Sequence, residues 1–224
     1  MRAATWPAPG PILRGKLDAP RPAGGVGLSR FIELGAYVLA YGLLYGMVMG
    51  TFGGVFTPER WWQMLYSAAK VPLLLLLSFV LCVPSFYVFC SLLGLQRDFP
   101  QALAAIVAAQ GVLAVTLASL APLVFVVYAS TDDYNAAVLY HGAPFLVASL
   151  AGQRALVRGY RPLIARNSRH RIAAILWLLA YVFVAIQLAW NLRPFVGSPR
   201  LPVEFFRADS FTNAYVALWR LVVG

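Results

Sequence analysis

Long apolar runs separated by short polar segments follow one another along this chain, and they predict helices that cross a membrane. A helix needs about 20 apolar residues to cross a hydrocarbon core of roughly 30 Å. Runs close to or above this length cover residues 31–52, 71–95, 100–128, 134–150 and 172–192. The expected fold class is therefore all-α, a polytopic membrane helix bundle of about five transmembrane helices within residues 31–192.

Two shorter segments have the pattern of helices that lie in the membrane interface. Residues 58–69 begin with Pro58 and Glu59 after a capping Thr57, and then contain two tryptophans of the kind found among lipid headgroups. In residues 210–223, apolar side chains recur at helical spacing over a stretch too short to cross the bilayer. We expect the first of these helices to end before the run at 71–95 begins.

The run at residues 134–150 is the least apolar of the five. Polar and helix-breaking residues interrupt it, namely Asn135, His141, Gly142 and Pro144. It is either a broken, partly water-exposed segment or a helix covered by protein. Asp132 and Asp133 stand directly before it, and we expect them to cap the helix start, because carboxylates complement the positive end of the helix dipole.

The composition is that of a membrane protein, and the positions of the basic residues explain the net positive charge. The chain has 224 residues, of which 61% are hydrophobic and 12% charged, and its mean hydropathy is +0.73. Soluble domains are about half apolar and a quarter charged. The net charge of +10 is typical of nucleic-acid-binding proteins too, but here the basic residues stand at the ends of apolar runs. Membrane topology and anionic headgroups explain that placement, so we expect no nucleic-acid partner.

The densest basic segment lies between the fourth and fifth runs, in an expected loop at residues 152–171. It contains Arg154, Arg158, Arg161, Arg166, Arg169 and Arg171 and no acidic residue. By the positive-inside rule this loop is cytoplasmic. The Pro- and Gly-rich residues 1–30 then form a flexible cytoplasmic arm, and residues 193–224 form an extracytoplasmic tail. The excess of arginine over lysine indicates a GC-rich bacterial source, so the expected location is the cytoplasmic (inner) membrane.

The same arginines are the candidate binding site for lipids or partners. Arg154, Arg158 and Arg161 recur at helical spacing and can extend the fourth run as one basic face. One interpretation is that they only fix the topology among the headgroups. The other is that they bind anionic lipid headgroups or an acidic partner subunit.

Three glycines in the first run, Gly42, Gly46 and Gly50, follow one another at a spacing of four residues. This spacing places them on one helical face, where a second backbone can approach closely. We expect a helix-packing face there, against a helix of this chain or of another subunit.

His141 is the one ionisable residue well inside an apolar run, which makes it the candidate for binding a cofactor such as haem or a pigment. The alternative is a neutral imidazole hydrogen-bonded to a neighbouring helix. A bis-histidine haem needs a second buried ligand, and His170 is expected at the opposite face. The chain has no Cys/His metal spacing, phosphate-binding loop or nucleophile elbow, so no catalytic residue, metal site or definite cofactor is expected.

Part of the second run resembles the corresponding span of bacterial Yip1-like membrane proteins. The residues that carry this resemblance are Lys70-Val71-Pro72, Pro84-Ser85-Phe86-Tyr87-Val88-Phe89 and Leu93-Gly94. The expected five spans and cytoplasmic amino-terminal arm are also similar to that family. The resemblance implies a small helical membrane protein that acts as an adaptor, with no catalytic residues.

Together these patterns favour a non-enzymatic integral membrane protein, an accessory or scaffold subunit of a larger bacterial membrane complex that contacts lipids and other membrane subunits. A small transporter or channel is the first alternative, based on Pro84, the interrupted fourth run and Gln110. A haem- or pigment-binding subunit that uses His141 is the second. A lipid-modifying enzyme that uses Asp132 and Asp133 is the last.

Overall fold

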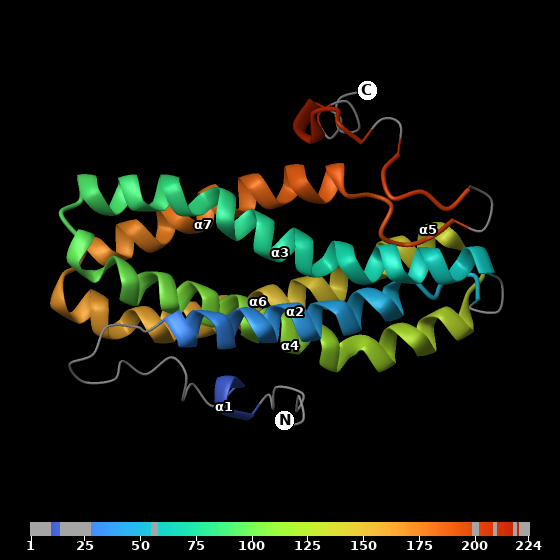
Figure 1. The fold of residues 1–224 in the computed structure, drawn as a ribbon, viewed down its shortest axis with the longest axis horizontal. Helices are drawn as coiled ribbons and strands as arrows, with labels where there is room; N and C mark the ends of the chain where they lie inside the picture. Colours follow the sequence, from blue (N-terminus) through green and yellow to red (C-terminus); the bar gives the residue numbers. More distant parts are fainter. Residues whose placement is uncertain are drawn as a thin grey trace.

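The computed structural model describes residues 10–13, 28–54, 58–198, 202–207, 210–216 and 219. Within these residues, all regular secondary structure is helical. Five long helices run along the molecule: α2 (Leu28–Met49), α3 (Pro58–Leu92), α4 (Phe99–Ser130), α6 (Gly142–Arg166) and α7 (Arg169–Asn191). Shorter elements are α1 (Gly10–Leu13), the 3₁₀ turn η1 (Gln96–Asp98) and α5 (Tyr134–Tyr140). The all-α helix bundle is confirmed (Figure 1).

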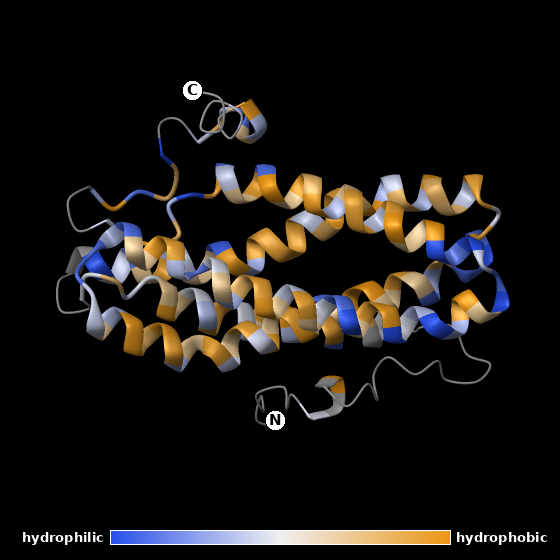
Figure 2. Cartoon of the chain, turned by 180° about the vertical axis from the view of Figure 1, so that it is seen from behind, coloured by the Kyte–Doolittle hydropathy of each residue, from blue (hydrophilic) through white to orange (hydrophobic). Residues whose placement is uncertain are grey.

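Four segments within these helices are long and apolar enough to cross a membrane, so the chain is a multi-pass membrane protein. They are Phe31–Met49, Arg60–Leu92, Gln96–Ser130 and Arg169–Asn191. Hydrophobic residues cover the middle of the long helices, while hydrophilic residues gather toward their ends (Figure 2). α6 is long enough to cross but is not among the four, so the number of five spans stays a prediction.

The five long helices form a nearly closed ring. α4 packs extensively on α2 and α6, α3 packs on α2 and α7, and α6 and α7 touch only sparsely. α4 carries the largest share of the core, and many of its buried residues are alanines. Small side chains let neighbouring helices approach α4 closely on several sides. The ring is therefore tightest around α4 and weakest between α6 and α7.

The bundle has two different ends (Figure 1). At the arginine end, α3 turns into α4 at residues 93–98, and α6 turns into α7 at Asn167 and Ser168. At the tail end, α2 ends, α3 and α5 begin, and the first part of the carboxy-terminal tail, residues 193–198, lies beside them. We call residues 193–198 the tail segment.

The expected interfacial helix at residues 58–69 is not a separate element. The helix begins at Pro58 as predicted but continues through Pro72 to Leu92, over about 52 Å. Its polar residues Gln63, Ser67 and Lys70 are buried in the protein instead of lying among headgroups. The prediction placed the segment as a whole in the lipid interface on account of its tryptophans, whereas these three polar side chains contact the rest of the chain.

The fourth run is broken, as one of its two interpretations expected. α5 ends at Tyr140, and α6 begins at Gly142. Pro144 has no N–H to bond the carbonyl of Tyr140, and its ring crowds that carbonyl, so a continuous helix is disfavoured at this point. Asp133 caps α5 as predicted, because its carboxylate accepts a 3.0 Å hydrogen bond from the backbone N–H of Asn135.

The expected basic loop at residues 152–171 is also helical, and this prediction was wrong. α6 continues to Arg166, and only Asn167 and Ser168 separate it from α7. The segment stays helical because its apolar residues share one face that packs on α4. The buried members of that face are Gly152, Ala155, Leu156, Tyr160 and Leu163.

The two ends of the chain are described only in part. Of the predicted arm at 1–30, the structure describes residues 10–13 and 28–30, and Ile12 of α1 is buried against Gly111 of α4. Of the predicted helix at 210–223, it describes 210–216 and 219, with helical turns at 214–216. The remaining parts of both predictions lie outside the described residues.

Candidate functional site

The glycine face of α2 lies directly against α3. A Cβ atom on Gly46 would stand 2.9 Å from the Cα of Ala68, and one on Gly50 would stand 2.6 Å from the Cα of Met64. A Cβ on Gly42 would be 3.1 Å from the side chain of Pro72. The predicted packing positions therefore face a helix of this same chain, and only glycine allows this backbone separation at Gly46 and Gly50.

His141 is buried at the tail end, where both of its ring nitrogens meet tyrosine hydroxyls. Nδ1 lies 2.9 Å from the Tyr45 hydroxyl, and Nε2 lies 2.6 Å from the Tyr128 hydroxyl. Tyr128 also donates a 3.0 Å hydrogen bond to the carbonyl of Met49. Its single proton is then used, so it accepts from Nε2–H of His141, and Nδ1 accepts from Tyr45.

This arrangement fixes one tautomer of a neutral imidazole and links α2, α4 and the α5–α6 junction. The ring has no nitrogen without a partner, so a haem or pigment metal at His141 would have to displace Tyr45 or Tyr128. The second histidine, His170, lies at the arginine end, as expected. The described residues contain no cluster of three or more His, Cys, Asp or Glu side chains that could hold a metal ion.

At the arginine end, part of the basic segment contacts the chain itself. His170 Nε2 lies 3.1 Å from a carboxylate oxygen of Asp98, and Arg166 lies 3.8 Å from the other oxygen. Arg166 also donates to Gln101, and Arg169 donates to the carbonyl of Leu93. These contacts hold the α6–α7 turn against the α3–α4 turn. Two of the six predicted binding arginines therefore have a structural role.

Three other arginines of the basic segment point away from the bundle. Arg154, Arg158 and Arg161 are exposed on α6, and within the described part of the chain they form no ion pair or hydrogen bond. They continue an exposed apolar stripe toward the arginine end of α6, and Val157 among them is 56% exposed. We call Arg154, Arg158 and Arg161 the α6 basic face. Arg171, on α7, is exposed as well.

A narrow crevice opens where α6 and α7 diverge over α4. Its polar lining includes Gln110, Gln153, Ser149 and Tyr181, and the Tyr181 hydroxyl donates a 3.1 Å hydrogen bond to Gln110. The crevice has a volume of about 30 Å³. This volume suits a water molecule, whereas small-molecule sites are about ten times larger. Gln110 of α4 is therefore bonded to α7 through Tyr181.

Side chains of the bundle hold the tail segment through three consecutive carbonyls. Lys70 Nζ lies 2.6 Å from the carbonyl of Pro194, the Ser67 hydroxyl donates to that of Phe195, and the Tyr134 hydroxyl donates to that of Val196 at 3.3 Å. Lys70 is fully buried. Sequence reasoning missed this contact, although a lysine next to an apolar run was a signal that it needs a partner.

No known protein family, no curated protein and no solved structure matches this chain. Membership of the Yip1-like family therefore stays a prediction from the residues quoted above.

Proposed function

We propose that this protein is a non-enzymatic accessory or scaffold subunit that holds an acidic segment of a partner membrane protein against the α6 basic face. The observation that carries the proposal is the character of α6. It is a 25-residue helix aligned with the spanning helices, yet it is not apolar enough to be counted with them. The part of its exposed face that carries the three arginines is therefore better suited to protein than to the lipid chains.

The depth of Arg154 supports a partner. At 1.5 Å per residue, about 18 Å of helix separates Arg154 from Arg166, the last residue of α6. Side chains on a helix tilt toward its amino terminus, which for α6 means away from the arginine end. The side chain of Arg154 therefore points away from the headgroup layer at the arginine end, which makes it harder for the guanidinium to reach those headgroups. A carboxylate on a neighbouring helix would satisfy it at its own depth.

The open side of the ring lies next to this face. α6 and α7 contact each other sparsely, and Gln153 lies in the crevice between them, one residue before Arg154. A partner helix in this position would cover Gln153 and Val157 and place its acidic residues opposite the arginines. Interhelical hydrogen bonds and ion pairs of this kind are common in membrane complexes. With the positive-inside orientation, the partner binds toward the cytoplasmic side of the inner membrane.

Site-specific photo-crosslinking in native membranes tests the proposal. A benzoylphenylalanine at Val157 of α6 is compared with one at Leu179 of α7, because the two side chains are similarly exposed at 56% and 62%. We expect a protein adduct from position 157 that is lost when Arg154, Arg158 and Arg161 are all changed to glutamine and retained when all three are lysine. If position 157 gives adducts with lipids but none with a protein, the adaptor role is rejected. The α6 basic face would then contact anionic lipids instead.

A further inference from the structure

A cavity of about 480 Å³ lies at the tail end, beside the tail segment and α5. Its walls are mainly apolar and come from α2, α5 and the tail segment, and two arginines stand among them. The lining residues are Met49, Tyr134, Val138, Arg193, Pro194, Phe195, Val196 and Arg207. The volume falls in the range of sites that bind small molecules, roughly 300–1,000 Å³.

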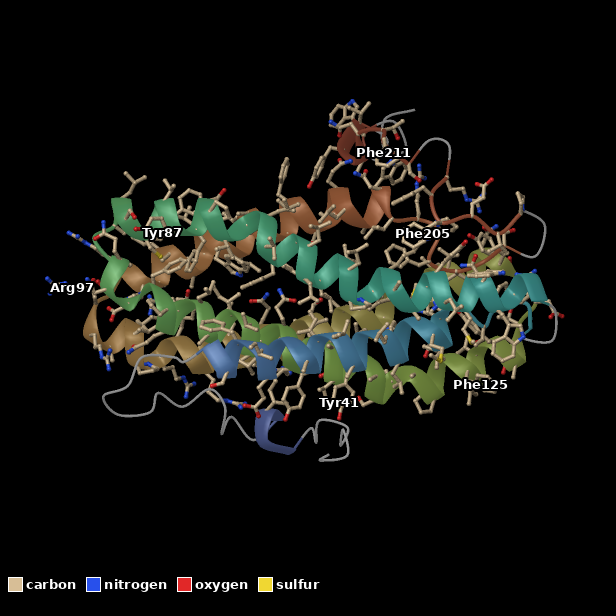
Figure 3. All side chains as sticks on the ribbon, viewed as in Figure 1. Tyr41, Tyr87, Arg97, Phe125, Phe205 and Phe211 are labelled. Atoms are coloured by element: carbon tan, nitrogen blue, oxygen red, sulfur yellow. The ribbon has the colours of Figure 1, made fainter. Side chains whose placement is uncertain are left out.

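The positive charge at this cavity is built into the protein. Arg193 is held with its guanidinium carbon 3.4 Å from the centroid of the Trp190 ring. Lys70 is bonded to the carbonyl of Pro194, and its ammonium lies 4.9 Å from the centre of the ring of Phe205, which is labelled in Figure 3. Arg207 is close enough to Lys70 for the two charges to repel each other. Within the described residues, neither Lys70 nor Arg207 forms an ion pair with a carboxylate.

The shape of the cavity and its charge together indicate the class of ligand. Met49, Phe195 and Val196 offer an apolar wall that an alkyl chain can cover. An anion is favoured beside the two arginines of the lining, with buried Lys70 bonded to Pro194 next to them. Arginine side chains bind phosphate through two parallel N–H donors. A headgroup with two negative charges suits two arginines with a lysine behind them better than a single carboxylate does.

We propose that this cavity binds an amphiphilic anion, an alkyl chain that ends in a phosphate monoester. Arg207 and Arg193 contact the phosphate, and the apolar wall contacts the first part of the chain. The site lies at the opposite end of the bundle from the α6 basic face and does not depend on the adaptor role. With the positive-inside orientation it opens toward the extracytoplasmic leaflet.

The test uses the full chain, purified in the neutral detergent dodecyl maltoside, and native mass spectrometry with four probes. Dodecyl phosphate is expected to bind at a ratio of one to one. Dodecylphosphocholine, which lacks the net negative charge, should bind at least tenfold more weakly. Inorganic phosphate, which lacks the alkyl chain, should neither bind measurably nor displace dodecyl phosphate. Extra dodecyl maltoside should not compete.

Two variants address the two halves of the site. Arg207→Gln removes a headgroup contact and should weaken dodecyl phosphate binding about tenfold or more. Val138→Trp fills the cavity from α5, where Val138 is 45% exposed, and should block binding with little effect on folding. The matched control is Arg97→Gln, an exposed arginine at the other end (Figure 3), which should leave binding unchanged.

Each alternative outcome contradicts the proposal in a definite way. Equal binding of inorganic phosphate would assign the cavity to small free anions. Equal competition by dodecyl maltoside would show an apolar groove without charge selectivity. Binding that survives both Arg207→Gln and Val138→Trp would place the amphiphile elsewhere on the protein.

Discussion

The two ends of the bundle use their polar residues in opposite ways. At the tail end, His141, Lys70 and Ser67 are buried, and their hydrogen-bond partners lie within the chain. At the arginine end, the arginines of the α6 basic face are exposed and lack such partners among the described residues. Polar groups near a membrane core must be satisfied, so these three tail-end residues are satisfied internally while the α6 basic face depends on its surroundings.

The two histidines show the same contrast at the level of one side chain. Both are buried, with His141 4% and His170 1% exposed. His141 has tyrosine hydroxyls at both ring nitrogens. His170 meets Asp98 through Nε2, while its buried Nδ1 has no hydrogen-bond partner in the described part of the chain. The tail-end histidine is thus the more completely bonded of the two, which leads to four predictions, from the largest expected effect to the smallest.

The largest effect is expected from Gly46→Leu. Its side chain would collide with the backbone of α3 at Ser67 and Ala68, so α2 and α3 must separate. We expect a loss of roughly 3 kcal/mol or more in the free energy of unfolding, at or above the usual cost of overpacking. Unfolding by SDS in mixed micelles measures it.

The matched control for Gly46 is Gly35, in the same helix. A Cβ atom on Gly35 would meet nothing within 4 Å, so Gly35→Leu should change the stability by less than about 0.5 kcal/mol. Equal losses from the two variants would mean that the close approach of α2 and α3 does not hold in the membrane protein.

The second prediction compares the histidines directly. His141→Phe leaves the Tyr45 hydroxyl without its partner in a buried site and should cost about 2 kcal/mol. His170→Phe should cost about 1 kcal/mol or less, because Asp98 is partly exposed to water and an unsatisfied Nδ1 is removed with the ring. The same SDS titration compares them.

An absorption spectrum of the natural protein accompanies this comparison. We expect no haem or pigment bands, since both nitrogens of His141 are engaged by tyrosines. Bands that disappear in the His141→Phe protein would contradict the hydrogen-bonded arrangement and favour the cofactor-binding function.

The difference between the two ends also separates what sequence reasoning could and could not predict. The long helices follow from apolar length, and their predicted limits at 100–128 and 172–192 lie within a few residues of α4 and α7. The interfacial helix at 58–69 was wrongly separated from α3 because its tryptophans are typical of a headgroup layer. The partners of its buried Lys70 and Ser67 are backbone carbonyls more than a hundred residues away, at Pro194 and Phe195. Carbonyls occur at every position, so no residue pattern marks the ones that bind.

In the arginine segment, the helix face could be predicted from the sequence, but the contacts of its residues could not. Helical spacing of Arg154, Arg158 and Arg161 was visible in the sequence and matches α6. The sequence did not show that Arg166, Arg169 and His170 join the two turns. Asp98 lies about 70 residues before them, and its position in space depends on how α3 and α4 connect. The sequence thus predicted which residues share a helix face better than which residues have a structural contact.

The third prediction tests the fixation of the tail segment. Lys70→Met keeps a long side chain but removes the donor to the Pro194 carbonyl, and a hydrogen bond from a charged group is worth about 1.5 kcal/mol or more. Trypsin should then cleave after Arg207 roughly tenfold faster than in the natural protein. Arg97→Gln, which removes a charge at the other end, should leave that rate unchanged. An unaltered rate in Lys70→Met would show that Ser67 and Tyr134 hold the tail without Lys70.

The smallest effect is expected from Arg166→Gln. Arg166 is 3.8 Å from Asp98, and its side chain is 55% exposed, so water and ions screen the pair. Exposed pairs of this kind contribute about 0.5 kcal/mol. SDS titration of Arg166→Gln, Asp98→Asn and the double variant isolates the coupling energy of the pair. A coupling energy between Arg166 and Asp98 above about 1.5 kcal/mol would be as large as the contribution expected for the hydrogen bond of buried Lys70. The α6–α7 turn would then be held as firmly as the tail segment, and the exposure of the α6 basic face alone would distinguish the two ends.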